Sequence, residues 1–460
     1  MDTGFIDHEK IFNYLNKSKK PDINEIREIT DHARELQGIS FEEAQRLLIA
    51  EDREQIDLIF DTANFIKNEI YGKRLVLFAP LYVSNLCNNE CLYCAFRKSN
   101  KEIARRTLTL EEIARETKIL INQGHKRILL VSGEGLGQSA LEYSIKAIET
   151  IYSTKTENGE IRRININIAP LPVDSFKRLK AAGIGTYQLF QETYHYDTYK
   201  NMHLKGPKSD YVYHLTAMDR AMEGGIDDVG VGILFGLYDY RFEIMALMQH
   251  IRHLEDKFGV GCHTISVPRI EPATGSELSE NPPYRLTDED FYKIIAILRI
   301  TVPYTGIILS TREDEKARRA SFKLGISQIS AGSRTNPGGY SEDESAAQFS
   351  LGDHRPLDEV IYDIATNGYV PSFCTGCYRL GRTGQDFMDL AKPGLIKQYC
   401  LPNAITSFKE YLTYYGSERT RMAGEKLIQS ALKDLPTEKL RETTLDALKR
   451  IEAGEKDLYL

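Results

Sequence analysis

Residues 75–94, LVLFAPLYVSNLCNNECLYC, join a short apolar run to three closely spaced cysteines. The apolar run, rich in branched and aromatic residues, predicts a buried strand. Seven further runs follow, separated by amphipathic helical patterns, at 127–131, 163–168, 186–190, 228–235, 263–267, 305–309 and 326–330. Eight strands that alternate with helices over roughly 260 residues predict an α/β fold, a (β/α)8 TIM-type barrel. An open doubly wound sheet is the alternative, although no G-x-G-x-x-G follows the first strand.

Helical patterns flank the predicted barrel on both sides. Residues 1–72 read as an N-terminal helical extension. The barrel spans 73–370, and its eighth helix fits 357–367, where Gly368 ends it. Residues 371–460 carry further cysteines and charged helical patterns, so they predict a separate C-terminal helical domain.

The composition excludes several protein classes. The 460 residues include 59 Lys and Arg against 66 Asp and Glu, so the formal net charge is −7. This acidic balance disfavours a nucleic-acid partner, which needs a basic surface. No run approaches 18 apolar residues, and the polar start MDTGFIDHEK lacks the apolar core of a signal peptide. We therefore expect a cytoplasmic protein with no membrane partner, whose clustered cysteines bind metal rather than form disulfides.

Cys87, Cys91 and Cys94 form a C-x3-C-x2-C triplet just after the first strand, where barrel enzymes place catalytic loops. Three thiolates can hold three irons of a 4Fe–4S cube and leave the fourth iron open. The amino and carboxyl groups of S-adenosylmethionine (SAM) can chelate such an open iron. A structural zinc site is the alternative, but zinc takes four closed ligands, and no other Cys or His lies within thirty residues.

Cys374, Cys377 and Cys400 form a second triplet, C-x2-C-x22-C, in the C-terminal domain. We interpret it as an auxiliary 4Fe–4S cluster, with zinc and a distant fourth ligand as the alternative. Chain that leaves the eighth helix emerges at the N-terminal end of the barrel, opposite the first triplet. The two clusters should therefore lie roughly 20 Å or more apart, at about 3.3 Å per strand residue.

His263 opens the sixth strand, at the same end of the barrel as the second triplet. Imidazole suits iron, so His263 is a candidate ligand there; a packed or hydrogen-bonded histidine is the alternative. The neighbouring Cys262 points to the opposite strand face and is interpreted as a small buried apolar residue.

The first triplet with its aromatic residue Tyr93, C-x3-C-x-aromatic-C, resembles the radical SAM superfamily. A second element supports the resemblance: Ser132-Gly133-Glu134, after the second strand, matches the superfamily's motif that receives the amino group of SAM. Taken alone, S-G-E is typical of an ordinary turn. Its position directly after a barrel strand favours the functional interpretation.

Further segments make the chain similar to the tyrosine lyase branch of this superfamily, and most closely to the HydG-type maturases of FeFe-hydrogenase. These segments are Ser84-Asn85-Leu86, 191–195, 263–269, 329–333 and the tail from Cys374 to Cys400. The 2-iminoacetate synthases of thiazole synthesis share the barrel motifs but lack the cysteine tail, so the tail decides between the two.

The resemblance implies a radical SAM carbon–carbon lyase that acts on L-tyrosine. The first cluster would cleave SAM to a 5′-deoxyadenosyl radical, and tyrosine would break into p-cresol and dehydroglycine. Dehydroglycine would become carbon monoxide and cyanide at the second cluster, whose extra iron is bound by free L-cysteine and by His263. The product would be an Fe(CO)(CN) precursor of the hydrogenase H-cluster. The implied partners are an electron donor such as ferredoxin or flavodoxin and a hydrogenase maturation scaffold.

Three polar residues at the C-terminal ends of strands are candidate catalytic residues. Arg312, after the seventh strand, can clamp the tyrosine carboxylate; an ion pair with Glu313 or Glu315 is the alternative. Glu192 and His195, after the fourth strand, are candidates to bind SAM or substrate, or to accept the phenol proton.

Gly230 and Gly232 alternate along one face of the fifth strand, and strand glycines usually mark the close approach of a ligand or backbone. The pair resembles the strand that contacts adenine in the superfamily; a tightly packed barrel interior is the alternative. Together with Ser266 these glycines reduce the side-chain volume that fills the barrel core, so we hypothesise an internal channel between the two clusters. Large apolar side chains in every layer of the barrel axis would contradict this hypothesis.

Two other functions stay open. A 2-iminoacetate synthase-like tyrosine lyase would release p-cresol without carbon monoxide or cyanide, even with both clusters bound. A non-catalytic iron–sulfur carrier or scaffold would not require Ser132-Gly133-Glu134, and it would form no 5′-deoxyadenosine from SAM.

Overall fold

The structure, a computed structural model, describes residues 3–16, 19–342 and 346–460. In this part of the chain, one parallel sheet has the order β10-β9-β8-β7-β6-β5-β2-β1-β11, and β10 also pairs with β1, so that eight strands close a barrel. The barrel strands are β1 (Arg74–Ser84), β2 (Arg127–Ser132), β5 (Arg163–Asn167), β6 (Thr186–Gln188), β7 (Asp228–Gly232), β8 (Thr264–Ser266), β9 (Gly306–Leu309) and β10 (Gln328–Ser330). The predicted TIM-type barrel is confirmed, and every predicted strand overlaps an observed one.

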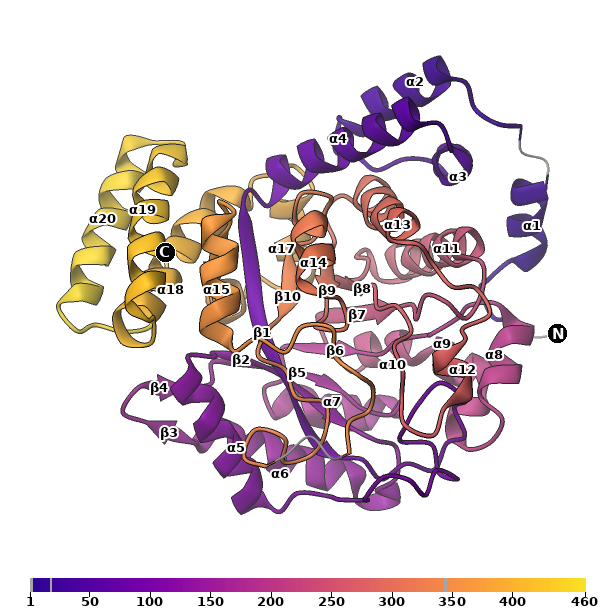
Figure 1. Ribbon diagram of the computed structural model, residues 1–460, viewed down its shortest axis with the longest axis horizontal. Coiled ribbons are helices and arrows are strands. Elements are labelled where there is room, and N and C mark those ends of the chain that lie inside the picture. The colour runs from indigo at the N-terminus through magenta and orange to yellow at the C-terminus, as the bar shows by residue number, and fades with distance from the viewer. Residues whose placement is uncertain (1–2, 17–18, 343–345) are drawn as a thin grey trace.

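Helices follow the barrel strands and cover the outside of the barrel (Figure 1). The main ones are α5 (Leu110–Gln123), α6 (Ala140–Ser153), α7 (Val173–Ala181), α10 (Ala217–Glu223), α11 (Tyr240–Phe258), α13 (Asp288–Thr301), α14 (Glu315–Phe322) and α15 (Leu357–Thr366). Capping boxes begin α5 at Thr109 and α13 at Thr287. Shorter elements are β3 (Lys155–Thr156), β4 (Gly159–Glu160), η1 (Gly137–Ser139), α8 (Tyr196–Met202), η2 (Pro207–Ser209), α9 (Tyr211–Leu215) and α12 (Glu277–Glu280).

In the described part of the N-terminal segment, four helices precede the barrel and lie on its flank (Figure 1). They are α1 (His8–Asn16), α2 (Ile23–Ala33), α3 (Phe41–Ile49) and α4 (Arg53–Ile70). α4 packs against α13, and both α1 and α3 pack against α11. The ammonium of Lys293 in α13 fastens this layer, because it donates to the carbonyl oxygens of Leu48 (2.8 Å) and Ala50 (2.5 Å).

The segment after the barrel adds a short strand and a set of helices. Strand β11 (Val370–Ser372) pairs with the start of β1, so the predicted boundary at 370/371 falls inside this strand. The helices are α16 (Gly376–Arg379), α17 (Gly384–Ala391), α18 (Lys397–Tyr414), α19 (Glu418–Ala431), η3 (Leu432–Asp434) and α20 (Glu438–Glu452). Glu410 of α18 forms a two-point ion pair with Arg162 (2.7 and 3.1 Å), which ties this helix to the start of β5. Among the described helices, none is long and apolar enough to cross a membrane.

Candidate functional site

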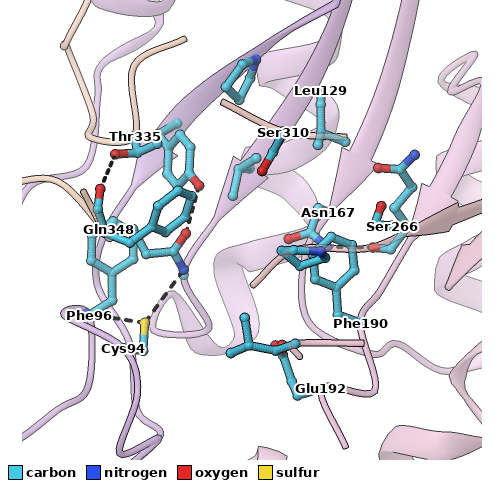
Figure 2. A pocket seen from close by; sticks show the side chains of 18 of the residues that line it. Cys94, Phe96, Leu129, Asn167, Phe190, Glu192, Ser266, Ser310, Thr335 and Gln348 are labelled. Carbon is cyan, nitrogen blue, oxygen red and sulfur yellow. Dashed lines mark hydrogen bonds between the residues drawn. The ribbon is translucent and has the colours of Figure 1, made fainter. Parts of the chain in front are cut away.

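A cavity of about 200 Å³ lies at the C-terminal ends of the barrel strands. We call this the upper end of the barrel. Loops after β1, β2, β6, β8, β9 and β10 line it, as in other barrel enzymes. The candidate residues that the structure brings to its wall are Cys87, Cys91, Tyr93, Cys94, Ser132, Gly133, Glu134, Glu192 and Arg312. Figure 2 shows Cys94 and Gln348 on one side of this cavity, with Asn167 and Ser266 on the other.

The loop after β2 presses directly on the first cysteine loop. An added Cβ at Gly133 or Gly135 would collide with the backbone of Leu86, so only glycine fits at these two positions. The amide of Asn88 also donates to the carbonyl oxygen of Glu134 (3.2 Å). The two loops therefore hold each other in place.

All three upper cysteines are free thiols, and each is buried or half-buried. Burial raises the pKa of all three thiols, that of Cys87 to about 11. At neutral pH such thiols lose their protons when they bind a metal. Sγ of Cys94 already accepts hydrogen bonds from the amide of Phe96 (3.4 Å) and from Nε2 of Gln348 (3.6 Å) (Figure 2).

A buried ion pair that was missed in the sequence lies beside the cysteines. Nζ of Lys208, in η2, lies 2.8 Å from Oε1 of Glu192. Burial opposes the charge of Lys208, but Glu192, Cys91 and Glu134 outweigh burial and raise the pKa of Lys208. The φ of Glu192 is +68°, a strained backbone of the kind found at functional positions. No local sequence signal marks Lys208, because η2 reaches the cavity only through the fold.

Glu134 lies close to this ion pair. Its Oε2 accepts a hydrogen bond from Nδ2 of Asn89 (2.6 Å), and burial raises the pKa of its carboxyl. Lys208 thus provides a cation near two carboxylates. Such an arrangement suits the amino and carboxyl groups of an amino-acid ligand.

Arg312 reaches the cavity without an ion-pair partner among the described carboxylates. Its guanidinium stacks on the ring of Phe349, with Cζ 3.3 Å from the ring centroid. The two alternative partners, Glu313 and Glu315, pair with other arginines. Its charge is therefore available to a ligand.

Glu271 lines the same cavity and was also missed in the sequence. Burial, together with the charge of Glu313, raises the pKa of Glu271 to about 7. The available signal was its place just past the C-terminal end of β8, where barrel enzymes carry functional groups. Together with Arg312, it offers groups of both charges to a substrate.

His195 does not line the cavity. It caps α8, where its Nδ1 bonds Oγ1 of Thr198 (2.8 Å), and its ring stacks on Tyr238. His195 lies away from the rim because the helix α8 begins at the next residue.

Tyr93, in contrast, lines the cavity, and its hydroxyl bonds Nε2 of His203 (2.7 Å).

A second cavity lies at the N-terminal, or lower, end of the barrel. The side chains of the second triplet and His263 line it together, namely Cys374, Cys377, Cys400 and His263. Burial lowers the pKa of His263 to about 4, so its imidazole is neutral, as metal binding requires. Nδ1 of His263 lies 3.5 Å from Oδ1 of Asp228, without hydrogen-bond geometry.

Four arginines line the lower cavity, and they too were missed in the sequence. Arg74, Arg127 and Arg163 each begin a strand, and Arg382 comes from the segment between α16 and α17. Arg127 donates to the carbonyl oxygen of Cys374 (3.0 Å). Arg163 lies 3.1 Å from Asp228. Arginines at the starts of strands resemble ordinary charged flanks in a sequence; in the barrel they converge and suit an anionic group.

The chain resembles known proteins over its whole length. Family models match the radical SAM superfamily over residues 81–251 and the Biotin and Thiamin Synthesis associated domain over residues 266–370. A crystal structure of HydG, a maturase of the FeFe-hydrogenase, is 52% identical and covers 100% of both chains, with a TM-score of 0.96. The chain belongs to the radical SAM superfamily, in the branch of HydG.

Two further relatives agree with this membership. HydG from Carboxydothermus hydrogenoformans is 42% identical in sequence, and the match covers 97% of this chain and 99% of the HydG chain, with a TM-score of 0.86. The 2-iminoacetate synthase of Salmonella typhimurium is 31% identical and covers 75% of this chain and 90% of its own length. The prediction of a radical SAM enzyme is confirmed.

Radical SAM enzymes hold a 4Fe–4S cluster and SAM, and the upper cavity of this enzyme suits both. The described residues on its wall include three thiols and no fourth thiol or imidazole, so a cube bound there keeps one iron open. In the described ranges, no three His, Cys, Asp or Glu side chains are arranged around a single metal ion. The three thiols of Cys87, Cys91 and Cys94 are the donors that a cube with one open iron requires.

The two cavities of this radical SAM enzyme share no lining residue. Arg74 at the lower cavity and Tyr82 at the upper one are eight residues apart on β1, or roughly 26 Å at about 3.3 Å per residue. Below the upper cavity, which Gln188 lines, Nε2 of Gln188 lies 3.4 Å from Oγ1 of Thr264, and Gly230 leaves room for both side chains. At this level β6, β7 and β8 contribute Gln188, Gly230 and Thr264, whereas β1, β2 and β9 bring the larger apolar Phe78, Leu129 and Ile308 to the wall of the upper cavity. The internal channel stays a hypothesis.

Proposed function

We propose that this enzyme cleaves L-tyrosine to p-cresol and dehydroglycine, and converts dehydroglycine to carbon monoxide and cyanide at a second iron–sulfur cluster. The product is an Fe(CO)(CN) precursor of the FeFe-hydrogenase H-cluster, passed to a maturation scaffold. The second cysteine triplet, opposite the first on the barrel axis, carries this proposal. The HydG structures cover 97–100% of this chain and the 2-iminoacetate synthase only 75%, which favours the maturase over the thiazole-synthesis enzyme.

At the upper site, Cys87, Cys91 and Cys94 hold the first cluster, and SAM bound there supplies a 5′-deoxyadenosyl radical. Arg312 takes the tyrosine carboxylate in a two-point contact, since a guanidinium matches a carboxylate in geometry. Glu271 accepts the tyrosine ammonium. The barrel wall around the cavity limits the access of water to the radical.

The ion pair of Lys208 and Glu192 serves SAM. With Glu134 it presents one cation and two carboxylates to the carboxyl and amino groups of SAM. Burial strengthens these contacts because water does not screen them. A ferredoxin or flavodoxin donates the electrons.

At the lower site, Cys374, Cys377 and Cys400 hold the second cluster. The neutral imidazole of His263 would hold the extra iron, and free L-cysteine would supply the remaining ligands there. In this division of labour, residues 73–370 carry out tyrosine cleavage and residues 371–460 hold the auxiliary cluster. Dehydroglycine crosses from one site to the other along the barrel axis, past the polar side chains of β6 and β8.

The deciding experiment is the double variant Cys374→Ala/Cys377→Ala, reduced and incubated with SAM and tyrosine. We expect p-cresol and 5′-deoxyadenosine to persist while carbon monoxide and cyanide are lost. Cys262→Ala, at a buried cysteine outside both triplets, is the matched control and should keep all four products.

Other results would support other functions. Equal loss of p-cresol and carbon monoxide in the double variant would give the tail a structural role only. A parent enzyme with both clusters that makes p-cresol but no carbon monoxide or cyanide would be a 2-iminoacetate synthase-like lyase. A parent that forms no 5′-deoxyadenosine would be a carrier.

A further inference from the structure

Gln348 joins the loop after β10 to the first cysteine loop. Its carbonyl oxygen accepts the amide of Ala95 (3.4 Å), and its own amide donates to the carbonyl oxygen of Thr335 (2.9 Å). Its side-chain Nε2 lies 3.6 Å from Sγ of Cys94, a bonding distance for sulfur because the sulfur atom is larger than oxygen (Figure 2). The backbone thus fixes this side chain beside a ligand of the first cluster.

Tyr82 decides which way the Gln348 amide points. The Tyr82 hydroxyl donates to Oε1 of Gln348 (2.7 Å), and Tyr82 itself is buried. A cluster-bound thiolate only accepts hydrogen bonds, so the NH2 group of Gln348 must face Cys94. The reverse orientation would place the amide oxygen against an anionic sulfur.

Sγ of Cys94 therefore has two N–H donors, the backbone of Phe96 (3.4 Å) and the side chain of Gln348. The second triplet differs: Sγ of Cys374 accepts the backbone amide of Gly376 (3.2 Å), and no side-chain amide of the described chain donates to it. Hydrogen bonds to cluster sulfurs stabilise the reduced, more negative cluster and so raise its reduction potential. Their effect is strong at a buried site, where water does not screen them.

We propose that Gln348 is a positioning residue for the first cluster, and that its bond to the Cys94 thiolate raises the reduction potential of that cluster. The inference rests on the proposed function, because it requires a cluster held by Cys87, Cys91 and Cys94. A higher potential brings the cluster within reach of the electron donor that starts each turnover. Gln348 does this through its contact with Sγ of Cys94.

The test is the midpoint potential of the first cluster in the fully reconstituted chain. Anaerobic redox titrations are followed by electron paramagnetic resonance, and the signal that SAM alters identifies the first cluster. Gln348→Leu keeps the volume and removes the donor, whereas Tyr82→Phe keeps the donor and frees its orientation. Gln123→Leu, the same change at the exposed end of α5, is the matched control.

We expect Gln348→Leu to shift the midpoint potential to a more negative value. Tyr82→Phe should shift it in the same direction by less, and Gln123→Leu should leave it unchanged. An unchanged potential in fully loaded Gln348→Leu would overturn the inference; if that variant fails to bind iron, an unchanged potential in Tyr82→Phe overturns it. A parent enzyme without any SAM-sensitive signal would instead overturn the proposed function, and this inference with it.

Discussion

Lys208 and Glu192 form a buried ion pair, with Nζ 2.8 Å from Oε1 and the two side chains only 11% and 12% exposed. Glu192 follows β6 in a left-handed backbone conformation, and Lys208 comes from η2, sixteen residues later. The charges of Cys91 and Glu134 also act on this ammonium. The pair thus places a cation next to the first cysteine loop and the proposed SAM site.

Lys208→Met should weaken SAM binding. The variant removes the ammonium that pairs with the SAM carboxyl group, and a hydrogen bond to a charged group contributes about 1.5–3 kcal/mol, so the affinity for SAM should fall by at least roughly tenfold. Equilibrium dialysis with SAM measures this affinity. Lys205→Met, three residues earlier and exposed, is the control, and a Lys208→Met enzyme with the parent's affinity would contradict the assignment.

Arg312→Lys should raise the KM for tyrosine and leave kcat nearly unchanged. Lysine keeps the charge but loses the two-point contact, so we expect KM to rise by about ten- to a hundredfold. p-Cresol formation at varied tyrosine concentration measures both constants. Arg319→Lys, on the outer face of α14, should change neither, and a fall in kcat at constant KM would argue against a carboxylate clamp.

Tyrosine binding should depend on pH through Glu271. Burial and the charge of Glu313 raise the pKa of Glu271 to about 7, so its carboxyl is protonated below that pH and ionised above it. Only the ionised form pairs with the tyrosine ammonium, so the KM for tyrosine should fall as the pH rises from about 6 to about 8. Glu271→Gln should show a flat KM over this range. A parallel slope in the parent and the variant would assign the titration to another group.

Gly133→Ala should remove the first cluster and leave the second. The new methyl group would collide with the carbonyl oxygen of Leu86, a backbone atom that cannot move without shifting the cysteine loop. Iron analysis should then give about half of the parent's iron if one of two cubes is lost, with no 5′-deoxyadenosine from SAM. Gly137→Asn, at a φ of +55° with open space around it, should bind iron normally.

His263→Ala should keep tyrosine cleavage and lose the chemistry of the lower site. Its neutral imidazole faces the second triplet, so its removal deprives the extra iron of its protein ligand while the three thiols stay in place. Carbon monoxide and cyanide should vanish while p-cresol persists. His253→Ala, on the outer helix α11, is the control. Loss of p-cresol in His263→Ala would mean that this histidine supports the barrel instead.

Much of this enzyme could be predicted from its sequence because local patterns carry the information. Alternating apolar runs and helical periodicity located all eight barrel strands. Cysteine spacing grouped six of the seven cysteines into two triplets. Barrel enzymes carry their functional residues at the C-terminal ends of the strands, and this rule identified Arg312 and Glu192 as candidates. Both line the upper cavity.

Other residues escaped sequence reasoning because their roles depend on contacts between distant segments. Gln348 reaches Cys94 across 254 positions, and Lys208 meets Glu192 from a separate loop. His195 illustrates the reverse case: it follows a barrel strand, yet its ring stacks on Tyr238 and does not line the cavity.

The sequence by itself determined the barrel, the two triplets and their opposite ends, since hydrophobic period and chain direction through a (β/α)8 unit are local or topological properties. Only the tertiary structure decided which charges face each site: Lys208 and Glu271 above, Arg74 and Arg127 below. The physical reason is that a side chain's electrostatic partners depend on burial and on distances of a few ångströms across the fold, which spacing along the chain does not encode.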